Sequence, residues 1–211
     1  MFVLTADQRG SRVNADLVPT ALAAVAHYGT TKLALAPERT AGDEIQVAIA
    51  DAGTALSILL ELTRTDRWSV GLGVGDVESP LPTSVRAARG EAFLNARDAV
   101  DRAKKASTRL AITAPAEGED AEALVRLLVE LRDRRTPEGW EVYDLLAAGH
   151  SQREAATRLG VSEGAVSLRA KAAGLRIEEA AVPALERILA RIDGGSVADA
   201  APGPRRQVVP D

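Results

Sequence analysis

The sequence contains no cysteine, so neither a disulfide bond nor a thiolate metal site can contribute to its fold or chemistry. Only six of its 211 residues are aromatic. This scarcity argues against a protein that binds single-stranded nucleic acid, because such proteins stack the bases on aromatic side chains. The two histidines, His27 and His150, stand alone in the sequence, and we interpret each as a surface or turn residue rather than a metal ligand.

Long apolar runs are also absent. No run approaches the roughly 20 residues that a membrane-spanning helix needs, and the N-terminal residues lack the basic, apolar and small-residue order of a secretory signal. Hydrophobic residues make up 46% of the chain and charged residues 27%, which is usual for a soluble globular protein. We therefore expect a cytoplasmic bacterial protein with no membrane partner.

The most distinctive stretch runs from residue 151 to residue 174 and reads SQREAATRLGVSEGAVSLRAKAAG. It predicts two short helices on either side of a tight corner formed by Gly160, Val161 and Ser162. Gly160 has no Cβ and so tolerates the backbone conformation that ends a helix sharply. The hydroxyl of Ser162 can accept from an unpaired backbone N–H at the start of the second helix.

The spacing of the second helix predicts one apolar and one polar face. The inward face is expected to carry Val166, Ala170 and Ala173, and the outward face Glu163, Ser167 and Lys171. A small-residue helix, a glycine corner and a capped second helix together resemble the helix-turn-helix of bacterial DNA-binding proteins. The positions that carry this resemblance are Gln152, Ala156, Gly160, Val161, Ser162 and Val166. A helical hairpin without a ligand is the alternative.

Charge favours the DNA-binding interpretation. Residues 151–176 contain five cations and two anions, a net charge of +3, whereas the whole chain carries −4. Positive charge gathered on one segment of an acidic chain is typical of a nucleic-acid contact.

The resemblance implies that the second helix enters the major groove of double-stranded DNA. Residues expected to face base edges are Ser162, Glu163, Gly164 and Ser167, and those expected to contact phosphates are Gln152, Arg153, Arg169 and Lys171. Because one such module provides little affinity, we expect a homodimer that binds two half-sites. The predicted function is that of a sequence-specific transcriptional regulator, which would associate with the nucleoid when bound.

The first half of the chain alternates between strand and helix patterns. Strands are predicted at residues 1–7, 32–39, 44–50, 68–77 and 109–113, and helices after Asn14 or Asp16, after Asp51 and over 90–105. This order is a β-α-β-β-α-β core with an appended helix and strand. It predicts an α+β chain in which residues 1–114 form a ferredoxin-like sheet layered on helices. The glycines of the strand at 68–77 share one face, where a helix can approach closely.

The second half is predicted to be helical. Residues 115–136 are interpreted as a linker and connecting helix, and residues 137–193 as an all-α helix-turn-helix domain. Trp140, Tyr143 and Leu146 are expected to brace the two short helices. Pro183 is expected in the first turn of a last helix, whose apolar stripe would close the small domain's core or form a dimer seam. Residues 194–211 have little to bury and are predicted to be disordered.

Three features of the first half occur together: Asp7 at a strand tip, Gly42-Asp43-Glu44 in a hairpin, and VGLGVGDV followed by GEAFLNARDAV. They resemble the SatD family of bacterial proteins over residues 1–113. They are also similar, more distantly, to the catalytic fold shared by class III nucleotidyl cyclases and diguanylate cyclases. In those cyclases two carboxylates hold Mg²⁺ against a nucleoside triphosphate. The resemblance implies that Asp7 and Asp43, with Glu44 beside them, form a nucleotide or metal site.

The sequence departs from the cyclase pattern on the helix that follows the glycine-rich strand. Leu94 stands where the cyclases have an asparagine, and Asn95 and Arg97 do not match the expected positions. We therefore assign no catalytic residues. We expect the cyclase-like domain to be a dimer platform or a sensor for a nucleotide effector. Mg²⁺ is the cofactor that such a nucleotide would bring. One alternative is a Mg²⁺-dependent nucleotide-processing enzyme with an accessory DNA-binding domain. Another is an adaptor whose helical half binds protein, against which the concentrated positive charge argues.

Overall fold

The computed structural model describes residues 1–29 and 31–194, and the tail predicted to be disordered lies, apart from Gly194, outside them. Within the described residues the chain is a mixed α+β structure with a five-stranded sheet and eight α-helices, which confirms the predicted α+β class. The elements of the first half are β1 (Phe2–Gln8), α1 (Val18–Ala26), β2 (Leu33–Arg39), β3 (Glu44–Ile49), α2 (Ala52–Leu62), β4 (Trp68–Val74), the 3₁₀ helix η1 (Val85–Ala87), α3 (Glu91–Ala103) and β5 (Leu110–Thr113).

The strands lie in the order β2-β3-β1-β4-β5. The central strand β1 is antiparallel to both of its neighbours, and Asp7 near its end lies opposite Glu44 on β3 and Ser69 on β4. The pair β2 and β3 is also antiparallel, whereas β5 is parallel to β4, from which it is separated in the chain by η1 and α3. The sheet is therefore mixed only at its β5 edge.

Alternating side chains of β1 face opposite sides of the sheet. Phe2, Leu4 and Ala6 belong to the large core that includes residues of α1 and α2. Val3 points to the other side, where it packs with Ala92 and Ala96 of α3. Asp7 follows the same alternation as Val3 and lies on the α3 side. The acidic end of β1 is thus covered by α3.

Glycines on β4 allow α3 to lie very close to the sheet. A Cβ on Gly71 would lie 2.2 Å from the backbone nitrogen of Val100, and a Cβ on Gly73 would lie 2.1 Å from that of Ala96. Real Cβ atoms do not approach backbone atoms so closely, so only glycine fits at either position without moving the helix. The predicted close approach of a helix to this strand is confirmed.

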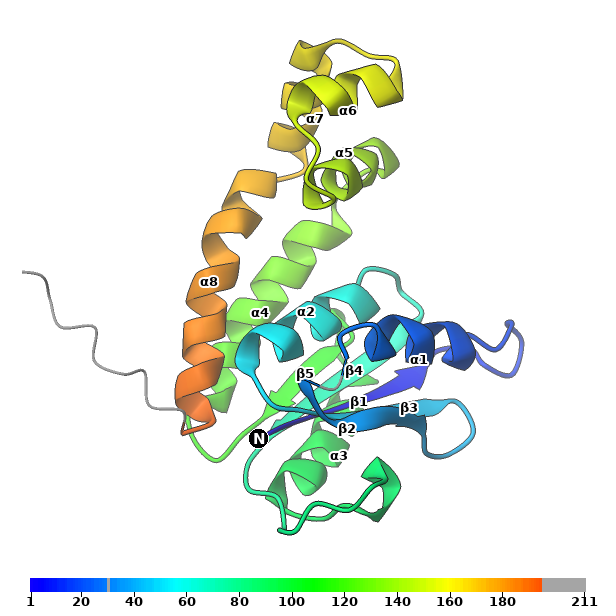
Figure 1. Ribbon diagram of the computed structural model, residues 1–211, viewed down its shortest axis with the longest axis vertical. Coiled ribbons are helices and arrows are strands. Elements are labelled where there is room, and N and C mark those ends of the chain that lie inside the picture. The colour runs from blue at the N-terminus through cyan, green and yellow to red at the C-terminus, as the bar shows by residue number, and fades with distance from the viewer. Residues whose placement is uncertain (30, 195–211) are drawn as a thin grey trace, which may run out of the picture.

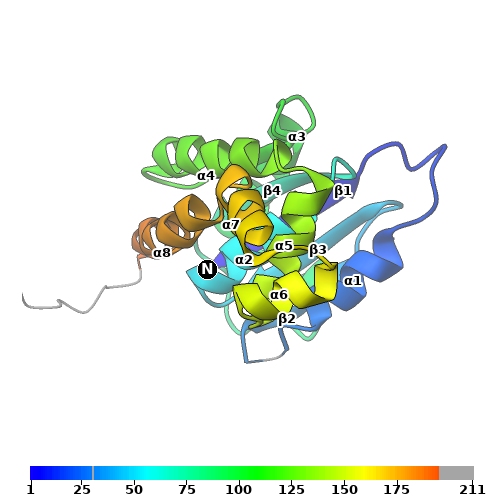
Figure 2. The ribbon, with the colours of Figure 1, turned by 90° about the horizontal axis from the view of Figure 1, so that it is seen from above.

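The second half consists of α4 (Gly118–Asp133), α5 (Pro137–Ala147), α6 (Gln152–Leu159), α7 (Glu163–Ala172) and α8 (Leu175–Ile192). Figure 1 shows α4 and α8, which we call the stalk, rising side by side from the sheet. The short helices α5, α6 and α7, which we call the head, gather at the far end of the stalk. Seen from above, the head lies over the sheet half (Figure 2).

The stalk shares the core of the first half. Val125 and Leu128 of α4 and Leu185 and Leu189 of α8 are buried in the same cluster as the side chains of β1 and α2. The apolar stripe of the last helix therefore packs on the core at the face of the sheet that carries α1 and α2. It does not close the small core of the head, which was one of its two expected roles. None of the helices in the described part of the chain is both long and apolar enough to cross a lipid bilayer.

Pro183 lies inside α8, and the prediction that it opens the last helix is wrong. The helix begins eight residues earlier, at Leu175, directly after Gly174. A proline inside a helix costs about 3 kcal/mol because its ring displaces the preceding turn and removes one hydrogen bond. Burial of Leu185 and Leu189 on the opposite side of the same helix offsets this cost. A long-range packing effect thus overrides a local stop signal.

The start of α1 also differs from prediction. Leu17, rather than Asn14 or Asp16, occupies its N-cap position and makes no side-chain cap. The Asp16 carboxylate instead accepts from the backbone N–H of Val18 at 3.0 Å. By contrast, Asp51 caps α2 as expected, accepting from the backbone N–H of Thr54 at 2.8 Å.

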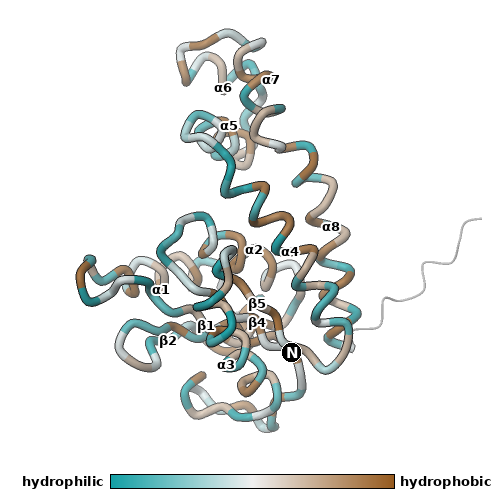
Figure 3. Tube along the Cα trace, turned by 180° about the vertical axis from the view of Figure 1, so that it is seen from behind, coloured by the Kyte–Doolittle hydropathy of each residue, from teal (hydrophilic) through white to brown (hydrophobic). Residues whose placement is uncertain are grey.

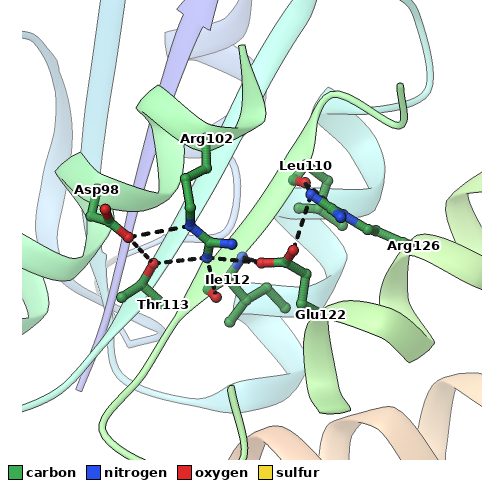
Figure 4. Close-up of polar contacts among 7 residues, drawn as sticks. All are labelled: Asp98, Arg102, Leu110, Ile112, Thr113, Glu122 and Arg126. Carbon is green, nitrogen blue, oxygen red and sulfur yellow. Dashed lines mark hydrogen bonds and ion pairs between the residues drawn. The ribbon is translucent and has the colours of Figure 1, made fainter. Parts of the chain in front are cut away.

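Side chains of α3 and α4 cap the free edge of β5 (Figure 4). The carboxylate of Glu122 accepts from the backbone N–H of Ile112 at 2.7 Å, and Arg102 donates to the carbonyl of Ile112 at 2.7 Å. Arg126 donates to the carbonyl of Leu110 at 2.8 Å, and Arg102 and Glu122 lie 2.9 Å apart. Because these groups occupy the backbone edge, it does not offer a free ladder to another strand.

Candidate nucleic-acid interface and acidic pocket

Local capping interactions define the two short helices of the head. At the start of α6, the Ser151 hydroxyl accepts from the N–H of Glu154 while the Glu154 carboxylate accepts from the N–H of Ser151, forming a capping box. Gly160 ends α6 in the left-handed region, with φ of 65°. Ser162 then caps α7, accepting from the N–H of Ala165 at 3.1 Å. The predicted glycine corner and serine cap are confirmed.

A small apolar core holds α6 and α7 on α5. Val142, Ala155, Ala156 and Val166 form this cluster, and Val166 is completely buried. The methyl side chains of Ala155 and Ala156 leave room for α7 to lie close to α6. Since Val166 fixes the inner face of α7, the opposite face of that helix points away from the head.

The structure leaves the predicted DNA-facing residues on the surface with one exception. Gln152, Arg153, Ser162, Glu163, Gly164, Ser167 and Lys171 are all exposed. The exception is Arg169, whose side chain is 31% exposed and lies 3.6 Å from the carboxylate of Glu141 on α5. A groove of about 570 Å³ also brings Gln152, Ser167 and Lys171 together, beside the first turns of α8.

A buried cluster of charged and aromatic residues joins the head to the stalk. Arg132 and Arg135, at the end of α4, both pair with the carboxylate of Glu178 on α8. The guanidinium groups of both arginines lie over the rings of Trp140 and Tyr143, at 4.4 to 5.4 Å from the ring centres. The two rings therefore face the stalk, whereas Leu146 packs with Val142 against the core of the two short helices. The helix α5 braces α6 and α7 as predicted, but through Leu146 and not through the two aromatic rings.

The sequence gives little sign of this cluster, because Glu178 is 46 residues from Arg132 and 43 residues from Arg135. Arg132 and Arg135 look like solvated charges at the end of an amphipathic helix, yet each is almost completely buried. Arg135 also donates to the carbonyl of Ala173, at 3.1 Å, and Arg132 to that of Leu60, at 3.2 Å. The cluster thus connects α4, α8 and the ends of α2 and α7.

A second contact links the head directly to the sheet half. Arg64, just after α2, makes two hydrogen bonds of 2.8 and 2.7 Å to the carboxylate of Asp144 on α5. Its guanidinium lies 4.3 Å from the centre of the Trp140 ring. The hydrogen bonds with Asp144 raise the pKa of Arg64. The face of α5 that carries Trp140 and Asp144 therefore contacts the sheet half, whereas Val142 packs against α6 and α7.

The structure brings the three predicted acidic residues to one end of β1 and β3. Asp7 and Glu44 are directly opposite each other on neighbouring strands, and Asp43 immediately precedes Glu44. A surface pocket of about 440 Å³ is lined by both Asp7 and Asp43, together with residues of the loop after β1 such as Ser11. Asp7 and Asp43 therefore lie close in space.

Each of these acids, however, already has a partner in the protein. Lys104, at the end of α3, places its Nζ 2.9 Å from Asp7, and Arg97 lies 3.1 Å from Glu44. The Asp43 carboxylate accepts a hydrogen bond from the Ser11 hydroxyl. Partial burial disfavours the charged form of Lys104, but the hydrogen bond to Asp7 and the nearby acids outweigh it and raise the pKa of Lys104.

Sequence reasoning missed this pairing, although a signal for it exists. Arg97 and Lys104 are seven residues apart, which is two helical turns, so they lie on the same face of the helix. Asn95 lies elsewhere, donating to the carbonyl of Val74 at 2.7 Å, and Leu94 is 73% exposed. Among residues 1–29 and 31–194, no three histidine, aspartate or glutamate side chains are arranged to hold a metal ion.

Comparison with protein-family models, with curated proteins and with solved structures finds no match to this chain. Its function is therefore inferred from its own residues and their arrangement.

Proposed function

We propose that this protein is a sequence-specific transcriptional regulator that binds double-stranded DNA through α6 and α7 of the head. The observation that carries the proposal is the exposed face of α7. Val166 anchors this ten-residue helix on one side, and Ser162, Glu163, Ser167 and Lys171 are exposed. The helix lies at the end of the molecule farthest from the sheet (Figure 1). A single helix presented in this way fits the major groove, which is about 12 Å wide.

The exposed cations of the head support a DNA partner. Arg153 and Arg158 on α6, Lys171 on α7 and Arg176 at the start of α8 are all exposed. Phosphate contacts supply most of the affinity of such proteins for duplex DNA and position the recognition helix. Serine hydroxyls and a glutamate at the start of α7 would then read base edges. Glu163 can accept from the amino group of cytosine.

We infer that the first half is a ferredoxin-like, cyclase-like domain that serves as a sensor or platform and not as a catalyst. The antiparallel order β4-β1-β3-β2, with α1 and α2 packed on one face, supports the ferredoxin-like assignment. The ion pairs of Lys104 with Asp7 and of Arg97 with Glu44 neutralise two carboxylates that a catalytic metal would need, and so argue against metal-dependent catalysis. The chemistry expected of an effector is that of a nucleotide, which would occupy the pocket between Asp7 and Asp43.

The phosphate contacts can be tested by substitution. Lys171→Ala and Arg153→Ala should each weaken the binding of all duplexes by a similar factor. Each should also lower the slope of log affinity against log salt by about one unit, because one fewer counterion is released. Arg187→Ala removes an exposed charge from the part of α8 near the sheet and is the matched control. Fluorescence anisotropy with a labelled duplex at several salt concentrations measures both quantities. Equal slopes for all four proteins would contradict the proposal.

The base contacts require a separate test. Ser167→Ala and Glu163→Gln should change which base pairs are preferred, with about 1–3 kcal/mol of discrimination lost at the affected position. The salt slope should stay as in the wild type. Magnesium-dependent turnover of a nucleoside triphosphate, abolished by Asp7→Asn, would instead support the enzyme alternative.

A further inference from the structure

The helix α4 carries a second apolar stripe, which is exposed at Leu124 and Leu127 and reaches the edge of the core at Leu131. Leu124 is 43% exposed and Leu127 is 68% exposed, and Leu131 is half-buried beside Gly174. The alternation of hydrophobic and hydrophilic positions along this helix can be followed in Figure 3. Since Val125 and Leu128 fill the core and only Leu131 packs against its edge, Leu124 and Leu127 are not needed to hold α4 on the sheet half.

The stripe has the residue spacing of a coiled-coil seam, with an acidic residue at one end and a basic residue at the other. Asp120, Leu124, Leu127, Leu131 and Arg134 follow one another at intervals of four, three, four and three residues, which keeps them on one narrow face. Asp120 and Arg134 at its two ends are both exposed. Arg134 is held by Glu130 one turn earlier, at 3.1 Å.

This face of α4 is complementary to the same face of a second copy when the two helices run antiparallel. If two copies of α4 lie antiparallel about Leu127, the leucines meet leucines, and Asp120 of each copy faces Arg134 of the other. A parallel pair would instead place like charges together at both ends. Within one chain the two charged residues are 14 positions apart, roughly 21 Å along the helix, and cannot meet. The charges therefore favour a second copy of this chain as the occupant.

We propose that α4 forms an antiparallel homodimer interface through Asp120, Leu124, Leu127, Leu131 and Arg134. The interface is isologous, since the same surface of each copy meets its equivalent on the other. Pairing through the neighbouring sheet edge is blocked, because Glu122, Arg102 and Arg126 occupy the backbone groups of β5 (Figure 4). The dimer would carry one head at each end of the paired stalks. It deepens the proposed function by supplying the second DNA-binding head, but it forms without DNA.

Sedimentation velocity of the full chain without DNA tests the interface. The wild type should be dimeric at micromolar concentration. Leu127→Asp should be monomeric, with an unchanged circular dichroism spectrum, because its side chain is mostly exposed and its loss leaves the core intact. Leu94→Asp changes an equally exposed leucine on α3 and should leave the dimer unchanged. A monomeric wild type, or a Leu127→Asp variant that stays dimeric, would overturn the proposal.

A charge exchange tests the orientation. Asp120→Arg and Arg134→Asp should each weaken dimerisation on the order of tenfold, because each turns two attractive contacts of the symmetric dimer into repulsive ones. The double variant should recover the wild-type dissociation constant to within about twofold. A double variant as weak as the two single changes combined would overturn the antiparallel arrangement. The two proposals can fail separately. A dimer that binds no duplex would contradict the DNA-binding function alone, and a monomeric wild type that binds duplex DNA would contradict the α4 interface alone.

Discussion

At the scale of single residues, the buried carboxylate of Glu178 is central to the contact between the stalk and the head. Its carboxylate pairs with Arg132 and Arg135 at once, and all three side chains are nearly inaccessible to water. One negative charge thus compensates two buried positive charges. The rings of Trp140 and Tyr143, which lie against the guanidinium groups, provide the rest of the favourable environment.

Replacing Glu178 should therefore destabilise the protein strongly. Glu178→Ala leaves two buried guanidinium groups without a counter-charge, and we expect a loss of about 3–5 kcal/mol in the free energy of unfolding. Urea denaturation followed by circular dichroism measures this loss. Glu179→Ala, at the exposed neighbouring position, is the control and should stay within about 0.5 kcal/mol of the wild type. A similar small change for both variants would show that the cluster is not important for stability.

Tyr28 should make stability sensitive to high pH. Burial, assisted by the nearby Glu61 and Tyr143, raises the pKa of Tyr28 above its ordinary value of about 10. The folded state then keeps the phenol proton more firmly than the unfolded chain does. The resulting stability is fully present below about pH 10 and is lost as pH rises towards the raised pKa. Tyr28→Phe should reduce this loss, measured as the free energy of unfolding at pH 8 and pH 10.5. Identical pH profiles for both proteins would contradict the assignment.

Residue types alone predict only part of the candidate sites. The serine cap at Ser162 could be predicted from local chemistry, and Asp7 and Asp43, which were expected in one site, line the same pocket. The partners Lys104 and Arg97 were missed because their roles depend on which helix covers which side of the sheet. Arg169 likewise has the charge expected of a phosphate contact, yet it lies against Glu141.

At the scale of elements, the contact between β4 and α3 depends on backbone atoms that almost touch. Gly73 lies so close to α3 that an added methyl group would meet both Ala92 and Ala96. Local glycine content was enough to predict this contact. The path of α8 was not predictable in the same way, because its continuation through Pro183 depends on burial against a distant core.

Gly73→Ala should be strongly destabilising. The Cβ would lie 2.1 Å from the nitrogen of Ala96 and 2.2 Å from the carbonyl oxygen of Ala92, so α3 must shift. Overpacking of this kind typically costs about 1–3 kcal/mol or more, and thermal unfolding measures it. Gly164→Ala is the matched control: the nearest atom to its Cβ is 3.9 Å away, and alanine favours helix by up to about 1 kcal/mol. An unchanged melting temperature for Gly73→Ala would contradict this packing.

At the scale of the whole molecule, the head and the sheet half are joined by stalk helices that share one core. Arg64 adds a direct link, from the end of α2 to Asp144 and Trp140 of the head. Under the proposed function, an effector bound in the acidic pocket would act on the head through these packed elements. The exposed face of α7 stays free in this arrangement.

Selection of bound sequences from a random duplex library, with the chain of residues 1–211, tests whether α6 and α7 bind DNA specifically. We expect enrichment of one motif made of two half-sites related by a dyad, at near-physiological salt. Ser167→Ala should enrich a motif altered at one position of each half-site. Enrichment of no motif by the wild type, with no dependence of binding on salt, would contradict the assignment of α6 and α7 as a DNA-binding surface.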